Sequence, residues 1–180
     1  QTDGMVVNTA TERAEKSRAL ITELLAADQP DVSHDKSSHL AEMMQLNNVE
    51  ESRFPSRQAD HVPLLDDSHV AMRVNLDACI HCNLCVRACR EVQVNDVIGM
   101  AGRGHDAKIV FDMDDPMGHS TCVACGECVQ ACPTGALMPS TVLDDDQDGD
   151  SQDYDREVQS VCPYCGVGCQ LSFKIKDDEV

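Results

Sequence analysis

Two copies of one cysteine spacing constrain this chain more than any other feature. The copies read Cys79-x2-Cys82-x2-Cys85-x3-Cys89 and Cys122-x2-Cys125-x2-Cys128-x3-Cys132-Pro133. Two residues between successive cysteines bring three sulfurs round a common centre, as a [4Fe–4S] cluster requires. The fourth cysteine cannot join them from the same turn without strain, so it is lent by the other copy. Pro133 fixes its own φ and is expected to end the short helix that carries the last cysteine.

The duplicated spacing predicts two sets of ligands. The set that we call cluster 1 consists of Cys79, Cys82, Cys85 and Cys132. The set that we call cluster 2 consists of Cys122, Cys125, Cys128 and Cys89. Each cluster therefore takes three thiolates from one motif and one from the other, which is the exchange found in two-cluster ferredoxins.

Zinc and disulfides are the competing uses of these cysteines. Two Cys-x2-Cys pairs alone would favour a four-cysteine zinc site, but zinc requires neither the third nor the fourth cysteine of each copy. Disulfides are less favoured still, because the total of 11 cysteines is odd and no secretory segment is visible. The spacing therefore favours iron–sulfur clusters, with structural zinc as the alternative.

Composition limits the other classes of function. Aromatic residues make up only 3% of the chain and Trp is absent, so we expect no large aromatic core and assign part of the stability to bound clusters. The net charge of −18 argues against binding to nucleic acid or anionic membranes. No run of apolar residues is long enough to span a bilayer. The chain begins at Gln1, and we expect it to continue beyond both ends.

The region before the cysteines is predicted to be helical and then irregular. Thr9-x-x-Glu12 has the pattern of a capping box for a helix over 9–27, whose apolar stripe consists of Leu20, Ile21, Leu24 and Leu25. Residues 28–69 are polar and interrupted by prolines. Ser38 is expected to cap a short helix with Leu40, Met43, Met44 and Leu46 facing inward. We interpret His34 and His39 as surface or capping residues.

Short strands are expected around the cysteine motifs. Residues 70–74 are one candidate, and 92–100 and 108–112 form a second pair joined by a turn at Gly102-Arg103-Gly104. His81 and His119 lie near cysteines but are not expected to be ligands, since four thiolates complete each cluster. The small residues Ala124, Gly126 and Gly135 should let backbone amides approach the sulfurs and tune the reduction potential.

The last part of the chain combines an acidic segment with a third cysteine motif. Residues 143–155 are rich in Asp but lack the closing Glu of a calcium loop, so we interpret them as a solvated linker. Cys162-x2-Cys165-x3-Cys169 supplies three thiolates for a third [4Fe–4S] cluster, with its fourth ligand expected beyond Val180. Leu171, Phe173 and Ile175 then alternate as in a strand.

Several of these stretches resemble known enzymes. Cys-Pro-Tyr-Cys-Gly-Val-Gly-Cys at 162–169 resembles the entry motif of molybdenum or tungsten bis-pterin formate dehydrogenases. Residues 72–138, through the stretches at 85–98 and 121–137, resemble the two-cluster segment of the catalytic alpha subunit of soluble NAD-dependent formate dehydrogenases. Gln-Thr-Asp-Gly-Met-Val-Val at 1–7 resembles the end of the plant-type [2Fe–2S] domain shared with the large iron–sulfur subunit of respiratory complex I.

The resemblance implies an α+β architecture in which a two-[4Fe–4S] ferredoxin-like domain is flanked by a helical N-terminal segment and the start of a molybdopterin-oxidoreductase domain. The implied divisions are 1–27 (the end of the [2Fe–2S] domain plus a helix), 28–69 (a connector), 70–140 (the two-cluster domain), 141–157 (the acidic linker) and 158–180 (the start of the pterin domain). Many relatives carry a His-x3-Cys-x2-Cys-x5-Cys cluster site in the connector. Residues 28–36 contain no cysteine, so we expect that cluster to be absent.

The resemblance further implies a cytoplasmic enzyme that oxidises formate to CO2 at a molybdenum or tungsten bis-pterin guanine dinucleotide outside this chain. Electrons would pass through the third cluster and the two ferredoxin-like clusters toward a [2Fe–2S] centre and a flavin- and NAD-binding partner subunit. Two alternatives remain open. One is a complex I-type or hydrogenase-associated electron-transfer subunit, and the other is a structural zinc module. Under the formate dehydrogenase hypothesis, none of these residues is expected to perform acid–base catalysis.

Overall fold

The computed structural model describes residues 2–56, 63–140, 154–162 and 166–178. They form two compact units, Gln1–Val142 and Leu143–Val180. The first unit mixes short helices with two antiparallel strand pairs, and the second contains one strand pair. The helices are α1 (Glu12–Ala27), α2 (His39–Leu46), α3 (Leu84–Arg87) and α4 (Glu127–Ala131). The strands are β1 (Met72–Val74), β2 (Ile98–Ala101), β3 (Lys108–Phe111), β4 (Leu137–Pro139), β5 (Arg156–Val161) and β6 (Gln170–Ile175).

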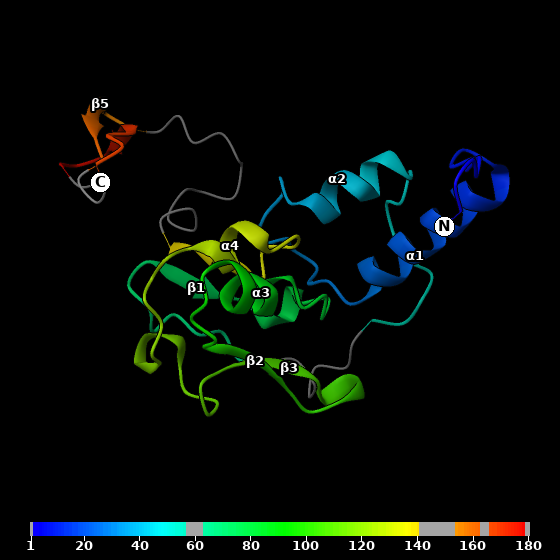
Figure 1. Cartoon of the computed structure of the whole chain (residues 1–180), viewed down its shortest axis with the longest axis horizontal. Coiled ribbons are helices and arrows are strands. Elements are labelled where there is room, and N and C mark those ends of the chain that lie inside the picture. Colours follow the sequence, from blue (N-terminus) through cyan, green and yellow to red (C-terminus); the bar gives the residue numbers. More distant parts are fainter. Residues whose placement is uncertain (1, 57–62, 141–153, 163–165, 179–180) are drawn as a thin grey trace. The chain divides into compact units, whose positions relative to one another are not determined.

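Strands β1 and β4 join the two ends of the cysteine-rich region. β1 precedes the first motif and β4 follows the second, and they pair antiparallel with Met72 opposite Pro139 and Val74 opposite Leu137 (Figure 1). Val74 and Leu137 are almost fully buried, so the pair lies in the core and not on its edge. The predicted strand at 70–74 is therefore confirmed in type but shorter, because Val70 is 96% exposed and lies outside the ladder.

Strands β2 and β3 form a hairpin between the motifs, as the sequence predicts. Gly102 turns the chain with φ of +69°, and a Cβ there would lie 2.2 Å from the carbonyl oxygen of Asp106, so only glycine fits. The predicted start of the first strand at residue 92 is wrong. Ala88–Val92 form one turn of π-helix that contains Cys89, and the extended chain begins only at Ile98.

The core of the first unit is small and built largely around the cysteine motifs. Among the described core residues Phe111 is the single aromatic side chain, in agreement with the low aromatic content. The buried cluster also contains Cys79, Cys85, Cys89 and Cys128. The aliphatic core and the thiols are therefore one continuous structure, so the helices that carry the cysteines cannot shift without disturbing the packing.

The N-cap of helix α1 lies two residues later than the sequence predicts. Its N-cap is Thr11, whose hydroxyl accepts from the amide of Ala14 at 3.3 Å. The predicted capping box on Thr9 does not form, and the Thr9 carbonyl accepts a hydrogen bond from Arg18 at 2.6 Å. Both threonines are of a residue type that favours the N-cap, and the structure places Thr11 there.

The inward faces of α1 and α2 differ in part from the predicted apolar stripes. In α1 the buried residues are Thr22 and Ala27, while Leu20, Ile21 and Leu24 are 39–55% exposed. In α2 the Ser38 cap is confirmed by its hydrogen bond from Ala41, and Leu40 is buried as expected. Met44 is half-buried, but Met43 and Leu46 are 39% and 67% exposed. α2 has only two turns, so a single edge of it reaches the rest of the unit.

The second unit is an antiparallel hairpin of β5 and β6 in which Val158 faces Phe173. Leu171, Phe173 and Ile175 alternate as half-buried positions of β6, which confirms the predicted alternation. Strand β5 was not predicted from the sequence, because its residues show no apolar alternation. In the structure all six of them are exposed. It starts at Arg156, inside the predicted 141–157 linker, while residues 141–153 of that linker lie outside the described residues.

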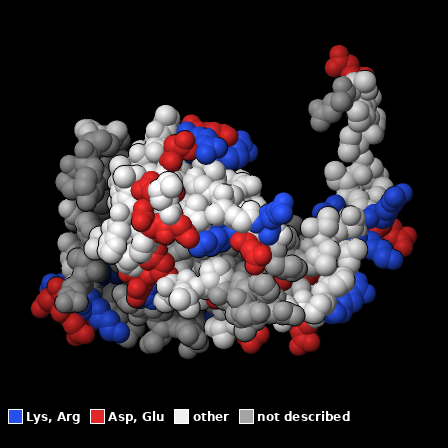
Figure 2. All heavy atoms as spheres, turned by 90° about the horizontal axis from the view of Figure 1, so that it is seen from below, with Lys and Arg blue, Asp and Glu red and all other residues white. Residues whose placement is uncertain are grey.

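The surface carries the acidic character expected from the net charge. Figure 2 shows more Asp and Glu than Lys and Arg side chains on the face in view. Within the part of the chain that is described, no helix is long and apolar enough to cross a membrane.

Candidate iron–sulfur centres

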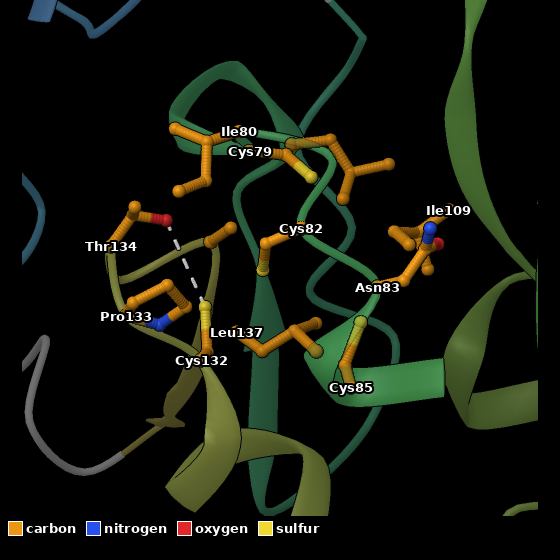
Figure 3. Close-up of a pocket in the computed structure, with 12 residues that line it drawn as sticks. Cys79, Ile80, Cys82, Asn83, Cys85, Ile109, Cys132, Pro133, Thr134 and Leu137 are labelled. Atoms are coloured by element: carbon orange, nitrogen blue, oxygen red, sulfur yellow. Dashed lines mark hydrogen bonds between the residues drawn. The ribbon is translucent and has the colours of Figure 1, made fainter. Parts of the chain in front are cut away.

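The first candidate centre is a pocket lined by the four thiols that the spacing assigns to cluster 1. Cys79 follows the 3₁₀ turn Leu76–Ala78, Cys82 lies in the next loop, Cys85 is in α3, and Cys132 ends α4. Figure 3 shows the four side chains directed toward one space. Three thiols come from the first motif and one from the second.

The second candidate centre repeats this arrangement with the motifs exchanged. Its pocket is lined by Cys122, Cys125, Cys128 and Cys89. The crossing over is possible because α3 and α4 contact each other, which brings the end of each motif to the start of the other (Figure 1). The empty space amounts to ≈ 340 Å³ in the first pocket and ≈ 290 Å³ in the second, part of it open to solvent.

The two cysteine loops share a backbone conformation that explains how they curl. His81 and Ala124, each directly before the second cysteine of its motif, have φ of +55° and +56°. Asn83 and Gly126, each directly after that cysteine, have φ of +61° and +79°. Left-handed residues on both sides of one cysteine turn the chain twice within four residues and aim three sulfurs inward. The duplicated spacing thus produces a duplicated geometry.

Within the described part of the chain, hydrogen bonds reach cysteine sulfurs in both pockets. The amide of Ala124 lies 3.4 Å from Cys122 Sγ, as the small residue at that position predicts. The amide of Val97 lies 3.4 Å from Cys89 Sγ. In the first pocket, the hydroxyl oxygen of Thr134 lies 3.8 Å from Cys132 Sγ (Figure 3). Such donors stabilise negative charge on the sulfurs and so tune a bound cluster.

Gly135 has a different role from the one that the sequence suggests. Its carbonyl accepts from the side-chain amide of Asn75 at 3.2 Å, and a Cβ at this position would lie 2.9 Å from Cβ of Asp35. The glycine therefore permits the connector to approach the segment after Cys132, and no bond from its amide to a sulfur is among the contacts of the described residues.

Burial and mutual repulsion hold the central thiols in their protonated form. Burial raises the pKa of the Cys85 thiol to about 12, and the neighbouring thiolates of Cys79, Cys132 and Cys82 add to this. The pKa of Cys128 is likewise raised to about 12 by burial and then by Cys122, Cys125 and Cys89. A positively charged iron core would compensate both effects, so assembly should release protons.

The donor sets fit [4Fe–4S] clusters in chemistry and arrangement. Each pocket offers four thiols around a space, and in such a cluster each of four thiolates binds a different iron. Among the residues that the structure describes, no three His, Cys, Asp or Glu side chains are arranged to hold a single metal ion.

The connector before the motifs contacts the first pocket, which the sequence does not predict. The prediction that His34 is a surface or capping residue is wrong: its Nε2 lies 2.9 Å from both carboxylate oxygens of Asp77, and both side chains are 27% exposed. The amide of Leu40 donates to the carbonyl of Pro133 at 2.9 Å. His39 is 82% exposed, as expected. Forty-three residues separate His34 from Asp77, so only the fold reveals this pair.

Asp66 organises the approach to the second motif and was also missed. Its carboxylate accepts from the Met117 amide at 2.7 Å and from the Ser68 hydroxyl at 2.6 Å, while Ser68 accepts from the Gly118 amide at 2.8 Å. Burial raises the pKa of Asp66, but these hydrogen bonds and the nearby His119 outweigh it, so the pKa is lowered overall. The Asp-x-Ser spacing is typical of an Asx turn and was a usable signal.

The third motif begins and ends at neighbouring strand ends. The amide of Cys162, just after β5, donates to the carbonyl of Cys169, just before β6, at 2.8 Å. Gly168 has φ of +69° at the return of the loop. Cys165, the remaining cysteine of this predicted set, lies outside the described residues.

Comparison with known proteins identifies two domain types in the chain. Residues 78–136 match the 4Fe-4S dicluster domain family, and residues 155–180 match the molybdopterin oxidoreductase Fe4S4 domain family. A crystal structure of NAD+-reducing [NiFe]-hydrogenase has a similar fold, with a TM-score of 0.69 and 22% identity over 78% of this chain and 61% of that chain.

Among curated proteins, the chain is similar to members of two enzyme groups. It is 32% identical over 183 residues to an NADH-quinone oxidoreductase subunit of Rhizobium meliloti, covering 98% of this chain and 20% of that protein. It is 29% identical over 142 residues to a Staphylococcus haemolyticus protein named "Putative formate dehydrogenase", covering 60% of this chain and 14% of that protein. The chain thus spans a fifth or less of the length of these relatives. The chain therefore contains a segment of the 4Fe-4S dicluster domain type, followed by a segment of the molybdopterin oxidoreductase Fe4S4 domain type.

Proposed function

We propose that this chain is the electron-relay part of a formate dehydrogenase catalytic subunit. The observation that carries the proposal is the pair of four-thiol pockets, each with three cysteines from one motif and one from the other. The molybdopterin oxidoreductase Fe4S4 match at 155–180 and the similarity to a protein named as a formate dehydrogenase support it.

In this proposal the ligands follow the pockets. Cys79, Cys82, Cys85 and Cys132 hold cluster 1, and Cys122, Cys125, Cys128 and Cys89 hold cluster 2. Cys162, Cys165 and Cys169 contribute to a third [4Fe–4S] cluster, whose fourth ligand is not among these residues. The proposed divisions of the chain remain 1–27, 28–69, 70–140, an acidic linker and the start of the pterin domain, with the linker now ending before Arg156.

The chain's own residues hold and shield the clusters. When bound, [4Fe–4S] clusters accept and release single electrons. Leu76, Ile109 and Leu137 line the first pocket and keep water from its inner side, which lowers the local dielectric constant. Cys82 and Cys125 are the exposed members of the two sets, so each cluster has one edge open to solvent where an electron can enter or leave.

The wider assembly is part of the same proposal. The intact subunit would hold a molybdenum or tungsten bis-pterin and a [2Fe–2S] cluster, and a flavin- and NAD-binding subunit would be its partner. The connector at 28–36 lacks the cysteines for an additional cluster, so no further relay is proposed there. Elsewhere in the 28–69 connector, contacts through His34 and Leu40 support the segments next to the first pocket.

A second candidate is an electron-transfer subunit of a complex I-type or hydrogenase-associated oxidoreductase. It is favoured by the alignment over 98% of this chain with the NADH-quinone oxidoreductase subunit of Rhizobium meliloti. A structural zinc module is the third and weakest candidate, since it would use the same thiols without sulfide.

Anaerobic analysis of iron and acid-labile sulfide, with EPR after dithionite reduction, tests the relay itself. Roughly eight irons and eight sulfides per chain for the two pockets would support it, and zinc without sulfide would refute it. The intact complex then separates the first two candidates. Cluster reduction by formate supports formate dehydrogenase, whereas reduction by NADH or H2 with no response to formate supports the second candidate.

A further inference from the structure

The Thr134 hydroxyl is a second structural feature of the first pocket besides its thiols. Thr134 is 3% exposed and lies two residues after Cys132, with its Oγ1 3.8 Å from Cys132 Sγ (Figure 3). Within the described part of the chain, this sulfur is the one hydrogen-bonding partner that the hydroxyl finds. A buried hydroxyl normally has a partner, because desolvating it without one is costly.

The direction of this hydrogen bond follows from the chemistry of the ligand. A cysteine that binds iron does so as a thiolate and carries no proton. The Thr134 hydroxyl must then donate its hydrogen to Cys132 Sγ. The bond is shielded from water, so it is electrostatically stronger than the same contact at the surface.

Cluster 2 differs from cluster 1 at the corresponding position. The residue two positions after Cys89 is Glu91, which is 53% exposed and turned to Arg87 at 3.0 Å. Cys89 accepts from the backbone amide of Val97 instead, at 3.4 Å. The two otherwise similar pockets therefore differ in a group that a single substitution can remove.

We propose that Thr134 is a positioning residue that raises the reduction potential of cluster 1 through the Cys132 sulfur. Reduction adds one electron and so one negative charge to the cluster. A hydrogen bond to a ligand sulfur stabilises the more negative state more strongly, and the potential rises. The hydroxyl thereby makes the two similar cubanes inequivalent, because cluster 1 accepts an electron more readily than its four thiolates alone would allow. The inference rests on the proposed cluster ligation.

The test is an EPR-monitored redox titration of the intact protein and of Thr134→Val and Thr134→Ser. Valine keeps the shape and removes the hydroxyl, and serine keeps the hydroxyl. At a fixed potential, the ratio of reduced to oxidised cluster 1 should fall about tenfold in the valine variant, which is about 59 mV for a one-electron couple. The serine variant should stay near the wild-type value.

Thr121→Val is the matched control. Its hydroxyl is adjacent to Cys122 but bonded to Asp112 Oδ1 at 2.9 Å, so its loss should move neither cluster's potential. Proton ENDOR on the reduced wild-type protein provides a second readout. Thr134→Val should lose one exchangeable-proton coupling of cluster 1, while the couplings from the amides of Ala124 and Val97 to cluster 2 remain.

Each other outcome overturns the proposal. Unchanged potentials in Thr134→Val would show that the hydroxyl has no influence on a cluster. Equal shifts of both clusters, or an equal shift in the serine variant, would show that the substitution acts through packing. If the wild-type protein binds iron and sulfide but Thr134→Val leaves the potential of cluster 1 unchanged, this inference alone is refuted. If the wild-type protein binds no iron and sulfide, the proposed function is refuted as well.

Discussion

Replacing Cys89 and Cys122 by alanine, singly and together, tests whether the two motifs exchange a ligand. Both thiols line the second pocket, so each single variant and the double variant should damage the same cluster. Each should lose about four irons per chain, and the double variant should lose no more than either single one. If each motif held its own cluster instead, the double variant would lose about eight.

The matched pair is Cys85→Ala with Cys89→Ala. These residues are only four positions apart in the chain, but they line different pockets. The double variant should therefore lose about eight irons, the sum of the two single losses. The assay is iron and acid-labile sulfide per chain after anaerobic reconstitution, with EPR of the reduced samples to count the clusters that remain.

The two pairs give opposite results under the two assignments. Additive loss for Cys89 with Cys122, and no additive loss for Cys85 with Cys89, would refute the ligand sets read from the pockets. It would also show that the contact between α3 and α4 does not control ligation. Because all variants remove only a sulfur atom, a general loss of folding would appear in both pairs alike.

The remaining predictions concern contacts that support the pockets. His34→Ala removes a half-buried hydrogen bond to Asp77 and should lower the stability by about 1 kcal/mol, or roughly 2–4 °C in the unfolding midpoint, while His39→Ala at an 82% exposed site should have no effect. Asp66→Asn weakens a set of charge-assisted hydrogen bonds and should cost about 1–2 kcal/mol, with Asp67→Asn as the control. Because the pKa of Asp66 is lowered in the folded protein, its carboxylate stabilises the fold at any pH above its unfolded-state pKa, and this stabilisation is lost only as the pH falls through the folded-state pKa. The difference in unfolding midpoint between the wild type and Asp66→Asn should therefore be constant from about pH 5 to 8. A decline of that difference within this range would contradict the lowered pKa of Asp66.

Local patterns predicted local structure well. The Ser38 cap, the β2–β3 hairpin and the alternation of β6 are all present, because each depends on neighbours within a few residues. The errors in the predicted helix and strand ends also arise from the use of local patterns alone. Thr9 and Thr11 lie two residues apart and both suit an N-cap, so the local pattern did not separate them, and α1 is capped by Thr11.

The contacts that support the candidate site were harder to predict. His34 finds Asp77, and Asp66 finds Met117, across 43 and 51 residues. Neither pair has a spacing that a sequence rule can use, because such contacts depend on how the connector and the loops pack. The apolar stripe of α1 failed for a related reason, since packing leaves Leu20 and Ile21 39% and 55% exposed and buries Thr22 instead.

The sequence by itself determined the number, the kind and the grouping of the cysteines. The spacing encodes the turn geometry directly, since two intervening residues leave few ways to direct three sulfurs to one centre. Tertiary structure decided what surrounds those sulfurs. The Thr134 hydroxyl, the His34–Asp77 pair and the exposed edges at Cys82 and Cys125 arise from packing between distant segments. Burial and hydrogen bonding are properties of the folded environment, and they set a potential that the identity of the ligands leaves open.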